Sequence, residues 1–175
     1  MAFRKPLIPF DLEIPTLRTE RYRLEPLTMR WLIQDYAAVA SSWHTLDGKM
    51  VPPGTLGPIT DLSIEQDVVE LGWHEREFTT RRSFAFIAMS HDDTTSLGYC
   101  YIYASPRTDE DAAILTWATY DPADPGADER LYDELHAWIH DAWPFANPVF
   151  PGRSVPWETW LDGLDLDTPV TASLG

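Results

Sequence analysis

Three apolar segments joined by two short polar connectors constrain the fold more than any other feature of this sequence. The segments are SFAFIAMS (83–90), LGYCYIYAS (97–105) and AAILTWATY (112–120). Each has the length of a strand and is rich in the aromatic and aliphatic residues that fill buried strands. The connectors HDDTTS and PRTDED are polar and turn-like, as between antiparallel neighbours. The sequence therefore predicts an antiparallel meander of three strands.

Further elements are predicted on both sides of the meander. The segment ERYRLEPL (20–27) places Tyr22 and Leu24 on one face and charged residues on the other, which is typical of a half-buried strand. Three segments show helical spacing instead, and they run from Thr28 to before Gly48, from Ser63 toward Phe78, and over 127–143. Their expected core-facing residues are, in that order, Trp31, Leu32, Tyr36, Val39, Ala40 and Trp43; Val68, Val69, Leu71 and Trp73; and Leu131, Leu135, Trp138 and Ile139.

Length and composition point to one globular domain. At 175 residues the chain is long enough to bury a core without disulfide or metal staples, and 44% of its residues are hydrophobic. We expect a single domain over 1–175, with an extended N-terminal arm (1–15) and a flexible C-terminal tail (168–175). The predicted helices and strands together indicate an α/β (α+β) fold class.

The charge balance argues against some classes of partner. Thirteen basic and 28 acidic residues give a net charge of −15, which repels nucleic acid and anionic membranes. An amine-bearing small molecule or a basic peptide suits such a surface better than an acidic substrate. The first fifteen residues hold prolines and acids where a signal peptide needs an apolar run, and no segment reaches membrane-spanning length. The single cysteine, Cys100, fits a reducing compartment, so we expect a cytoplasmic protein.

The order of these elements, together with three segments, carries a family resemblance. LRTERYRLEPLT (17–28), SFAFIAM (83–89) and LGYCYIYA (97–104), with its Leu97-Gly98 pair, resemble strands of the GNAT superfamily of N-acetyltransferases. The first segment is similar to the branch that acetylates ribosomal-protein N-termini. The resemblance covers roughly residues 16–143. It implies a mixed, mostly antiparallel sheet flanked by helices, and transfer of an acetyl group from acetyl-CoA to an amine.

The resemblance also implies where acetyl-CoA would bind. Backbone groups of Trp117, Ala118 and Thr119 would hold the pantetheine arm, and the loop DPADPGADER (121–130) would hold the pyrophosphate at the start of a helix. Gly126, Ala127 and Asp128 are the residues of this loop that correspond to the family's binding positions. The loop nevertheless carries acids where a phosphate needs amides and positive charge. We therefore expect acetyl-CoA binding to be weak or absent.

Candidate catalytic groups follow the same resemblance. Asp111 and then Glu110 are the preferred general bases, in an acidic turn that also contains Asp109, although a solvated turn is the simpler interpretation. Other residues with an alternative structural role are Tyr132, a general acid or a core residue, and Tyr99, Tyr101 and Tyr103, which line a groove or pack in the core. His136 and His140 lie one helical turn apart, but without an evident third ligand no metal site is predicted.

Two functions stay open on the sequence alone. The first is a GNAT-like N-acyltransferase that uses acetyl-CoA as co-substrate. The alternative is a catalytically silent GNAT-like module that binds a small molecule or a protein. About thirty residues follow the last long helix, with no clear closing hairpin. We expect the open sheet edge to be covered either by segment 146–164 or by a second copy of the chain in a homodimer.

Overall fold

The computed structural model describes residues 5–59 and 62–164. Within these residues the strands form a five-stranded sheet in the order β1-β2-β3-β4-β5. The strands are β1 (Tyr22–Pro26), β2 (Ser83–Ser90), β3 (Ser96–Ala104), β4 (Ala112–Ala118) and β5 (Pro148–Val149). The strands β1 to β4 are antiparallel neighbours, and β5 runs parallel to β4. The predicted meander and the mixed, mostly antiparallel sheet are confirmed.

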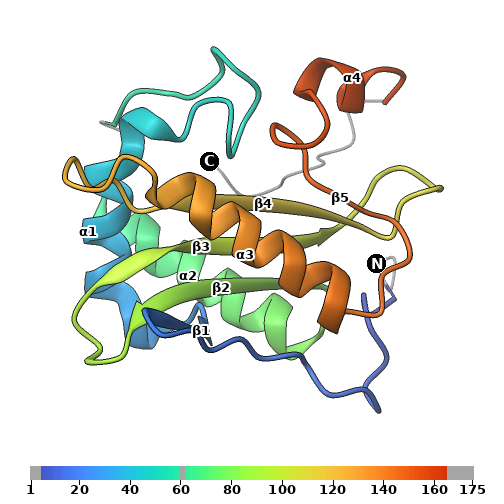
Figure 1. Ribbon diagram of the computed structural model, residues 1–175, viewed down its shortest axis with the longest axis horizontal. Helices are drawn as coiled ribbons and strands as arrows, with labels where there is room; N and C mark the ends of the chain where they lie inside the picture. The colour runs from blue at the N-terminus through green and yellow to red at the C-terminus, as the bar shows by residue number, and fades with distance from the viewer. Residues whose placement is uncertain (1–4, 60–61, 165–175) are drawn as a thin grey trace.

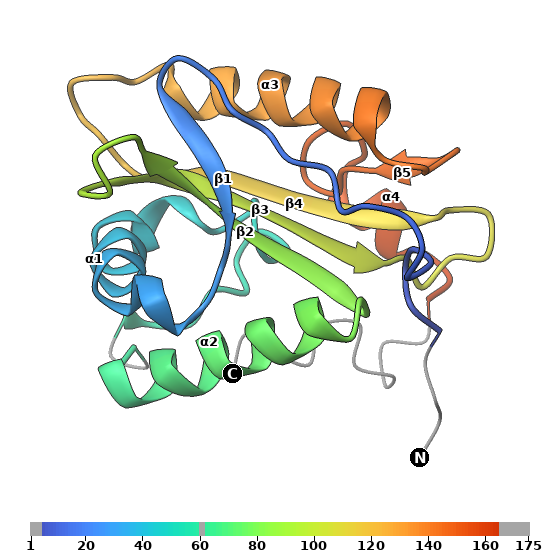
Figure 2. The ribbon, with the colours of Figure 1, turned by 90° about the horizontal axis from the view of Figure 1, so that it is seen from below.

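Helices cover both faces of the sheet, with α3 on one side and α1 and α2 on the other (Figure 1 and Figure 2). They are α1 (Leu32–Ser42), α2 (Ile64–Thr79), α3 (Ala127–Ala142) and α4 (Trp157–Leu161), with short 3-10 turns η1 (Met29–Trp31) and η2 (Trp43–Thr45). Because both faces are covered, all of β4 is buried, and only the last residue of β2 is partly exposed.

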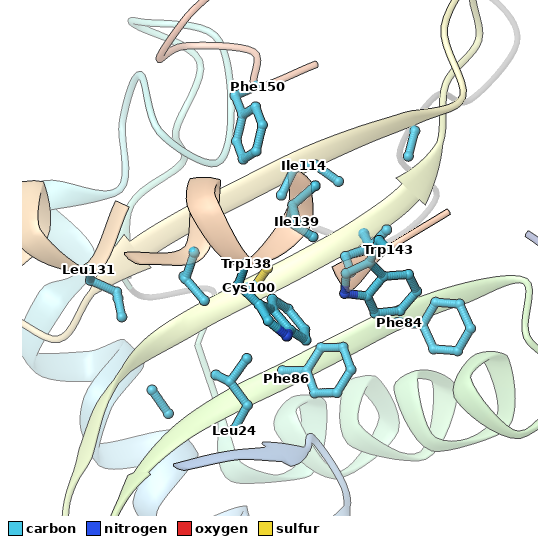
Figure 3. Packing of buried hydrophobic residues seen from close by; sticks show 14 of the residues in the cluster. Leu24, Phe84, Phe86, Cys100, Ile114, Leu131, Trp138, Ile139, Trp143 and Phe150 are labelled. Carbon is cyan, nitrogen blue, oxygen red and sulfur yellow. The ribbon is translucent and has the colours of Figure 1, made fainter. Parts of the chain in front are cut away.

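The α3 side of the sheet holds an aromatic core (Figure 3). The ring centres of Phe84 and Trp143 lie 5.0 Å apart, and those of Phe86 and Trp138 lie 5.5 Å apart, both edge to face. Such pairs add stabilisation beyond the burial of their area. The residues that α3 buries are those predicted from its spacing, namely Leu131, Leu135, Trp138 and Ile139.

The N-terminal arm contributes to the same core where the structure describes it. Ile8 is 1% exposed and packs in the aromatic core, and the amide of Leu7 donates to the carbonyl of Arg81 (2.6 Å). The predicted C-terminal tail (168–175) lies outside the described residues. Among the residues that are described, no helix combines the length and the apolar character needed to cross a membrane.

Helix α2 turns a polar face toward the sheet. Its N-cap is Ser63, whose hydroxyl accepts from the amide of Gln66 (3.1 Å). Its buried residues are Asp67, Leu71, His74 and Glu77, whereas Val69 is 66% exposed and Val68 is 38% exposed. The prediction that both valines face the core was wrong. The same helix could bury either face by periodicity, and packing against β2 and α1 selects the polar one.

Segment 146–164 covers the outer edge of β4. Ala112 and Ala113 pair with β5, and beyond β5 the side chain of Arg153 donates to the carbonyl of Thr116 (3.0 Å). This edge therefore has hydrogen-bond partners from within the chain, which is one of the two covers predicted from the sequence.

Candidate functional site

The end of β4 and the loop that follows it are tied to the rest of the domain by backbone hydrogen bonds. The amide of Thr119 donates to the carbonyl of Leu97 on β3 (3.0 Å). The amide of Tyr120 donates to the hydroxyl of Ser42, a fully buried residue at the end of α1 (2.8 Å). These two donors are engaged before the chain enters the loop toward α3.

Asp128, in the first turn of α3, connects three distant segments. Its Oδ1 accepts from the backbone amide of Ala118 (2.9 Å). Its Oδ2 lies 2.8 Å from Nη1 of Arg153 and 3.1 Å from Nζ of Lys49. Burial opposes ionisation of this carboxyl, but the hydrogen bonds from Arg153 and Ala118 and the charges of both cations lower its pKa. Asp128 is therefore an ionised anchor for both basic side chains.

Arg153 fills the space beside β4. Its Nη2 donates to the carbonyl of Thr116 (3.0 Å), and its guanidinium lies 5.3 Å from the ring centre of Tyr132. The carbonyl of Thr116 and the amide of Ala118 both point to the edge of β4 that faces away from β3, because residues two apart in a strand share an edge. Arg153 and Asp128 thus bond one carbonyl and one amide at that edge.

The loop before α3 uses its own acids as hydrogen-bond partners. Asp121 accepts from the amide of Ala123 (2.8 Å), and the amides of Asp124 and Ala127 donate to carbonyls within the loop (both 3.1 Å). Asp124 also forms an ion pair with Arg130. Gly126 has an ordinary negative φ of −93°, so it does not shape a glycine-specific turn here.

The predicted general bases lie at the opposite end of β4. The carboxylate of Glu110 accepts from the Ser105 hydroxyl (2.5 Å) and from Nε1 of Trp160 (3.0 Å). The carboxylate of Asp111 accepts from the amide of Asn147 (2.6 Å). These bonds hold the turn between β3 and β4 against the segment after α3. A role for Glu110 or Asp111 as a base stays a prediction.

A cavity of about 340 Å³ lies between α1, α2, the connector between them, and the sheet. Its volume is at the lower end of the range for small-molecule sites. The polar and aromatic residues that line it are Asp35, Thr55, Gln66, Asp67, Glu70, His74, Trp43, Tyr101, Tyr103 and Trp117. Two tyrosines of the predicted stripe therefore line a groove, whereas Tyr99 is fully buried and stacks on Trp117, with ring centres 4.2 Å apart.

The cavity contains buried polar atoms that lack partners. Asp35 is 4% exposed and Asp67 is 5% exposed, and Oδ1 of Asp35, Oδ2 of Asp67 and Nδ1 of His74 have no hydrogen-bond partner among the described residues. Burial and then the charge of Asp67 raise the pKa of Asp35, and burial raises that of Asp67. Burial lowers the pKa of His74 to about 4, so its imidazole is neutral near pH 7.

Sequence reasoning missed this cluster. A signal was present, because Asp67, Glu70 and His74 recur three and four residues apart, as a buried helix face does. Asp35 likewise interrupts the apolar run WLIQDYAAV (31–39). Polar residues in such positions are normally assigned to solvent.

Neither a protein-family model nor the sequence of a curated protein matches the chain. Solved structures do match it. The ribosomal-protein-S5-alanine acetyltransferase of Vibrio fischeri aligns over 74% of this chain and 69% of its own, with a TM-score of 0.56 and 12% identity. The chain has the GNAT acetyltransferase fold. The resemblance predicted from strand order and from the Leu97-Gly98 pair is thereby confirmed for the fold.

Two further solved structures match with lower TM-scores. The microcin C7 self-immunity acetyltransferase, solved with acetyl-CoA and AMP, gives a TM-score of 0.48 at 12% identity, over 71% of this chain and 64% of its own. An acetyltransferase from Agrobacterium tumefaciens gives 0.45 at 17% identity, over 77% of this chain and 71% of its own.

The GNAT fold implies an acetyl-CoA site at the residues predicted from the sequence, and the side chains present do not fit that group. The amide of Ala118 is bonded to Asp128, the amide of Thr119 is bonded to β3, and Arg153 fills the edge beside them. The amide of Ala127, at the start of α3, donates within its own loop. A pantetheine arm would have to displace these bonds, and a pyrophosphate would meet the carboxylate of Asp128 at the helix N-terminus.

Proposed function

We propose that this chain is a catalytically silent GNAT-fold module that binds a small molecule in the cavity between α1, α2 and β3. The observation that carries the proposal is the closure of the β4 edge by Asp128 and Arg153. An acyltransferase must place its thioester next to the acceptor, and this fold has one strand edge at which the donor arm can be aligned. Here that edge of β4 is hydrogen-bonded to the side chains of Asp128 and Arg153.

Electrostatics support the same function. The loop and the first turn of α3 carry four carboxylates, and three cations are paired with two of them. The carboxylates are Asp121, Asp124, Asp128 and Glu129, and the cations are Lys49, Arg130 and Arg153. The excess of acids cancels the partial positive charge that a helix N-terminus offers to an anion. Both Lys49 and Arg153 are already paired with Asp128, so neither is free for a phosphate.

Acetyl transfer from acetyl-CoA to an amine is the second candidate function. It is favoured by the fold and by Trp117, which belongs to β4 and also lines the cavity. An acceptor bound in this cavity would therefore lie beside the strand that holds the donor in an acyltransferase. This function requires that Arg153 leave the β4 edge.

A thermal-shift titration with acetyl-CoA tests the proposal. We expect no saturable shift in the melting temperature of the wild-type chain. A ligand that did bind would be detected, because at about a hundred times its dissociation constant it would stabilise the fold by roughly 2.7 kcal/mol. A double variant, Asp128→Ala with Arg153→Ala, removes both members of this ion pair together, so neither is left without the other. A matched control, Asp124→Ala with Arg130→Ala, removes the exposed pair in the same loop.

Binding at micromolar acetyl-CoA by the wild-type chain, with acetylation of an added amine, would overturn the proposal in favour of acyl transfer. Tighter binding by the Asp128/Arg153 double variant than by both the control and the wild type would show that the pair closes the site.

A further inference from the structure

Helix α2 has an outer face that no other described helix or strand covers. In Figure 2, α2 forms the lowest layer of the domain, and none of the described elements lies beneath it. The outer face of α2 consists of Glu65, Val68, Val69, Gly72 and Arg76, which recur three and four residues apart and are all exposed. Val69 is 66% exposed and Val68 is 38% exposed. Two β-branched apolar side chains are therefore in contact with water on this face.

The glycine at the centre of this face is not required by packing within the chain. Gly72 has a helical backbone, and an added Cβ would meet no atom of the described chain within 4 Å. Glycine in the interior of a helix lowers its stability relative to alanine. What glycine does allow is close approach by another backbone or side chain from outside. The space above Gly72 is therefore suited to a side chain of a second molecule.

The two ends of the face carry opposite charges. Glu65 lies in the first turn of α2, and Arg76 lies in the last turn. Glu65 forms no ion pair with the described residues. The side chain of Arg76 lies 3.1 Å from Glu77 of its own helix but is 61% exposed, so it can reach a carboxylate outside the chain.

The face is complementary to itself. The midpoint of α2 between Glu65 and Arg76 is also the midpoint between Val69 and Gly72. A second α2 that packs antiparallel, about a two-fold axis at this midpoint, places Glu65 opposite the partner's Arg76. The same packing places Val69 opposite the partner's Gly72. Because a two-fold axis repeats every contact, two ion pairs and two apolar contacts form at once.

We propose that the outer face of α2 is an interface between two copies of this chain, which pack their α2 helices antiparallel. The proposal goes beyond the proposed function and does not depend on it. The sheet edge at β4 does not supply this interface, because segment 146–164 covers it. The inner face of α2 lines the cavity, so the two cavities of the dimer lie on opposite sides of the paired helices.

The net charge of the chain opposes this association at long range. Each copy carries a charge of −15, so two copies repel each other in the absence of salt. At about 0.15 M salt the screening length is about 8 Å, which weakens this repulsion more than it weakens ion pairs in direct contact. A contact made by one pair of helices is also small, so we expect a reversible dimer with a micromolar dissociation constant.

Sedimentation equilibrium of the full chain at about 0.15 M salt tests the proposal. We expect the mass to rise from that of the 20.0 kDa chain toward twice that value as the concentration is raised from about 1 µM to about 500 µM. Glu65→Arg and Arg76→Glu each place like charges opposite one another, and each should weaken the dimer at least about tenfold. The double variant restores opposite charges in exchanged positions and should recover the wild-type dissociation constant within about threefold.

The two single variants separate this contact from the effect of net charge. Glu65→Arg makes the chain less negative and Arg76→Glu makes it more negative, so net charge alone would shift the dissociation constant in opposite directions. Asp133→Arg is the matched control for Glu65→Arg, since it makes the same change of charge at an exposed position of α3, across the sheet. It should not weaken the dimer.

A methyl group at the centre of the face gives a second test. Gly72→Ala should weaken the dimer about fivefold or more, because the added Cβ stands where the partner's Val69 packs. The same variant should raise the melting temperature of the monomer, because alanine favours the helix. Circular dichroism melting curves of the other variants check that each is folded.

A chain that stays monomeric up to about 500 µM would overturn the proposal. A dimer that both single charge variants leave intact would overturn it as well, because that dimer would use another surface. Failure of the double variant to recover association would also contradict the antiparallel pairing. These readings of mass are independent of the acetyl-CoA titration, which tests the proposed function.

Discussion

The carboxylate of Asp128 lies 2.8 Å from the guanidinium of Arg153, although the two residues are 25 positions apart in the sequence. Asp128 lies in the first turn of α3, and Arg153 follows β5. Their contact places a half-buried ion pair across the strand edge at which the GNAT fold implies the acyl donor. The fold is kept while this edge is closed, which separates the architecture of the chain from the activity associated with that architecture.

Loss of Arg153 should destabilise the domain more than loss of an exposed arginine. Arg153→Met removes the donor of the Thr116 carbonyl and one of the two cations paired with Asp128, and hydrogen bonds to charged groups contribute roughly 1.5–3 kcal/mol. We expect a loss of about 2 kcal/mol in the free energy of unfolding, measured by urea denaturation. Arg130→Met, which breaks the exposed pair with Asp124, should cost less than about 1 kcal/mol. Equal losses would contradict the structural role of the Asp128–Arg153 pair.

Gly98 should tolerate no side chain. It has a φ of +154°, and an added Cβ would lie 2.5 Å from the carbonyl oxygen of Trp117 and would also overlap the side chain of Leu131. Gly98→Ala should therefore destabilise the domain by about 2 kcal/mol or more, through overpacking and backbone strain.

A matched glycine on α2 provides the control for this prediction. An added Cβ at Gly72 would meet nothing within 4 Å, and its backbone is helical. Gly72→Ala should stabilise the domain by about 0.5–1 kcal/mol. Chemical denaturation of the two variants checks the pair, and a neutral Gly98→Ala would show that β3 has a different register there.

His74 should make the domain sensitive to mild acid. Burial lowers its pKa from 6.5 to about 4, so the folded state favours the neutral imidazole. The contribution of His74 to the free energy of unfolding is complete above pH 6.5. It is lost as the pH falls from 6.5 toward 4, because in that range the unfolded chain binds a proton at this residue and the folded chain does not. The lowering of the pKa from 6.5 to about 4 corresponds to about 3 kcal/mol.

A comparison with His74→Gln isolates this contribution. The buried carboxyls Asp35 and Asp67 titrate in the opposite sense, but they are present in both proteins and cancel in the difference. The stability of the wild type relative to His74→Gln should therefore fall by about 3 kcal/mol between about pH 7 and pH 4, followed by guanidinium denaturation. A difference independent of pH would mean that His74 is hydrated or paired.

The meander and the buried face of α3 could be predicted because each is specified by local sequence. Segment 83–90 is apolar between its two terminal serines, as expected for a strand covered on both faces, and it forms β2 with those bounds. Leu131, Leu135 and Trp138 recur at helical spacing in an otherwise polar helix, so only one face can be buried.

The cavity could not be predicted, because its chemistry arises from contacts between distant segments. Asp35 and Asp67 meet through the packing of α1 on α2, which no local pattern specifies. Val69 and Asp67 lie on different faces of α2. Hydrophobicity alone predicted that the face with Val69 is buried, whereas the face with Asp67 is. Arg153 likewise reaches Asp128 only because the chain returns along β4 after α3.

We propose that Asp128 and Arg153 close the β4 edge to an acyl donor. Amide NMR spectra of the wild-type chain, recorded during titration with acetyl-CoA to millimolar concentration, test this closure. We predict that the amide signal of Ala118, which donates to Asp128, keeps its position throughout. A saturating shift of this signal at micromolar acetyl-CoA, together with shifts for Thr119 and Ala127, would show that the edge is open and place the donor there.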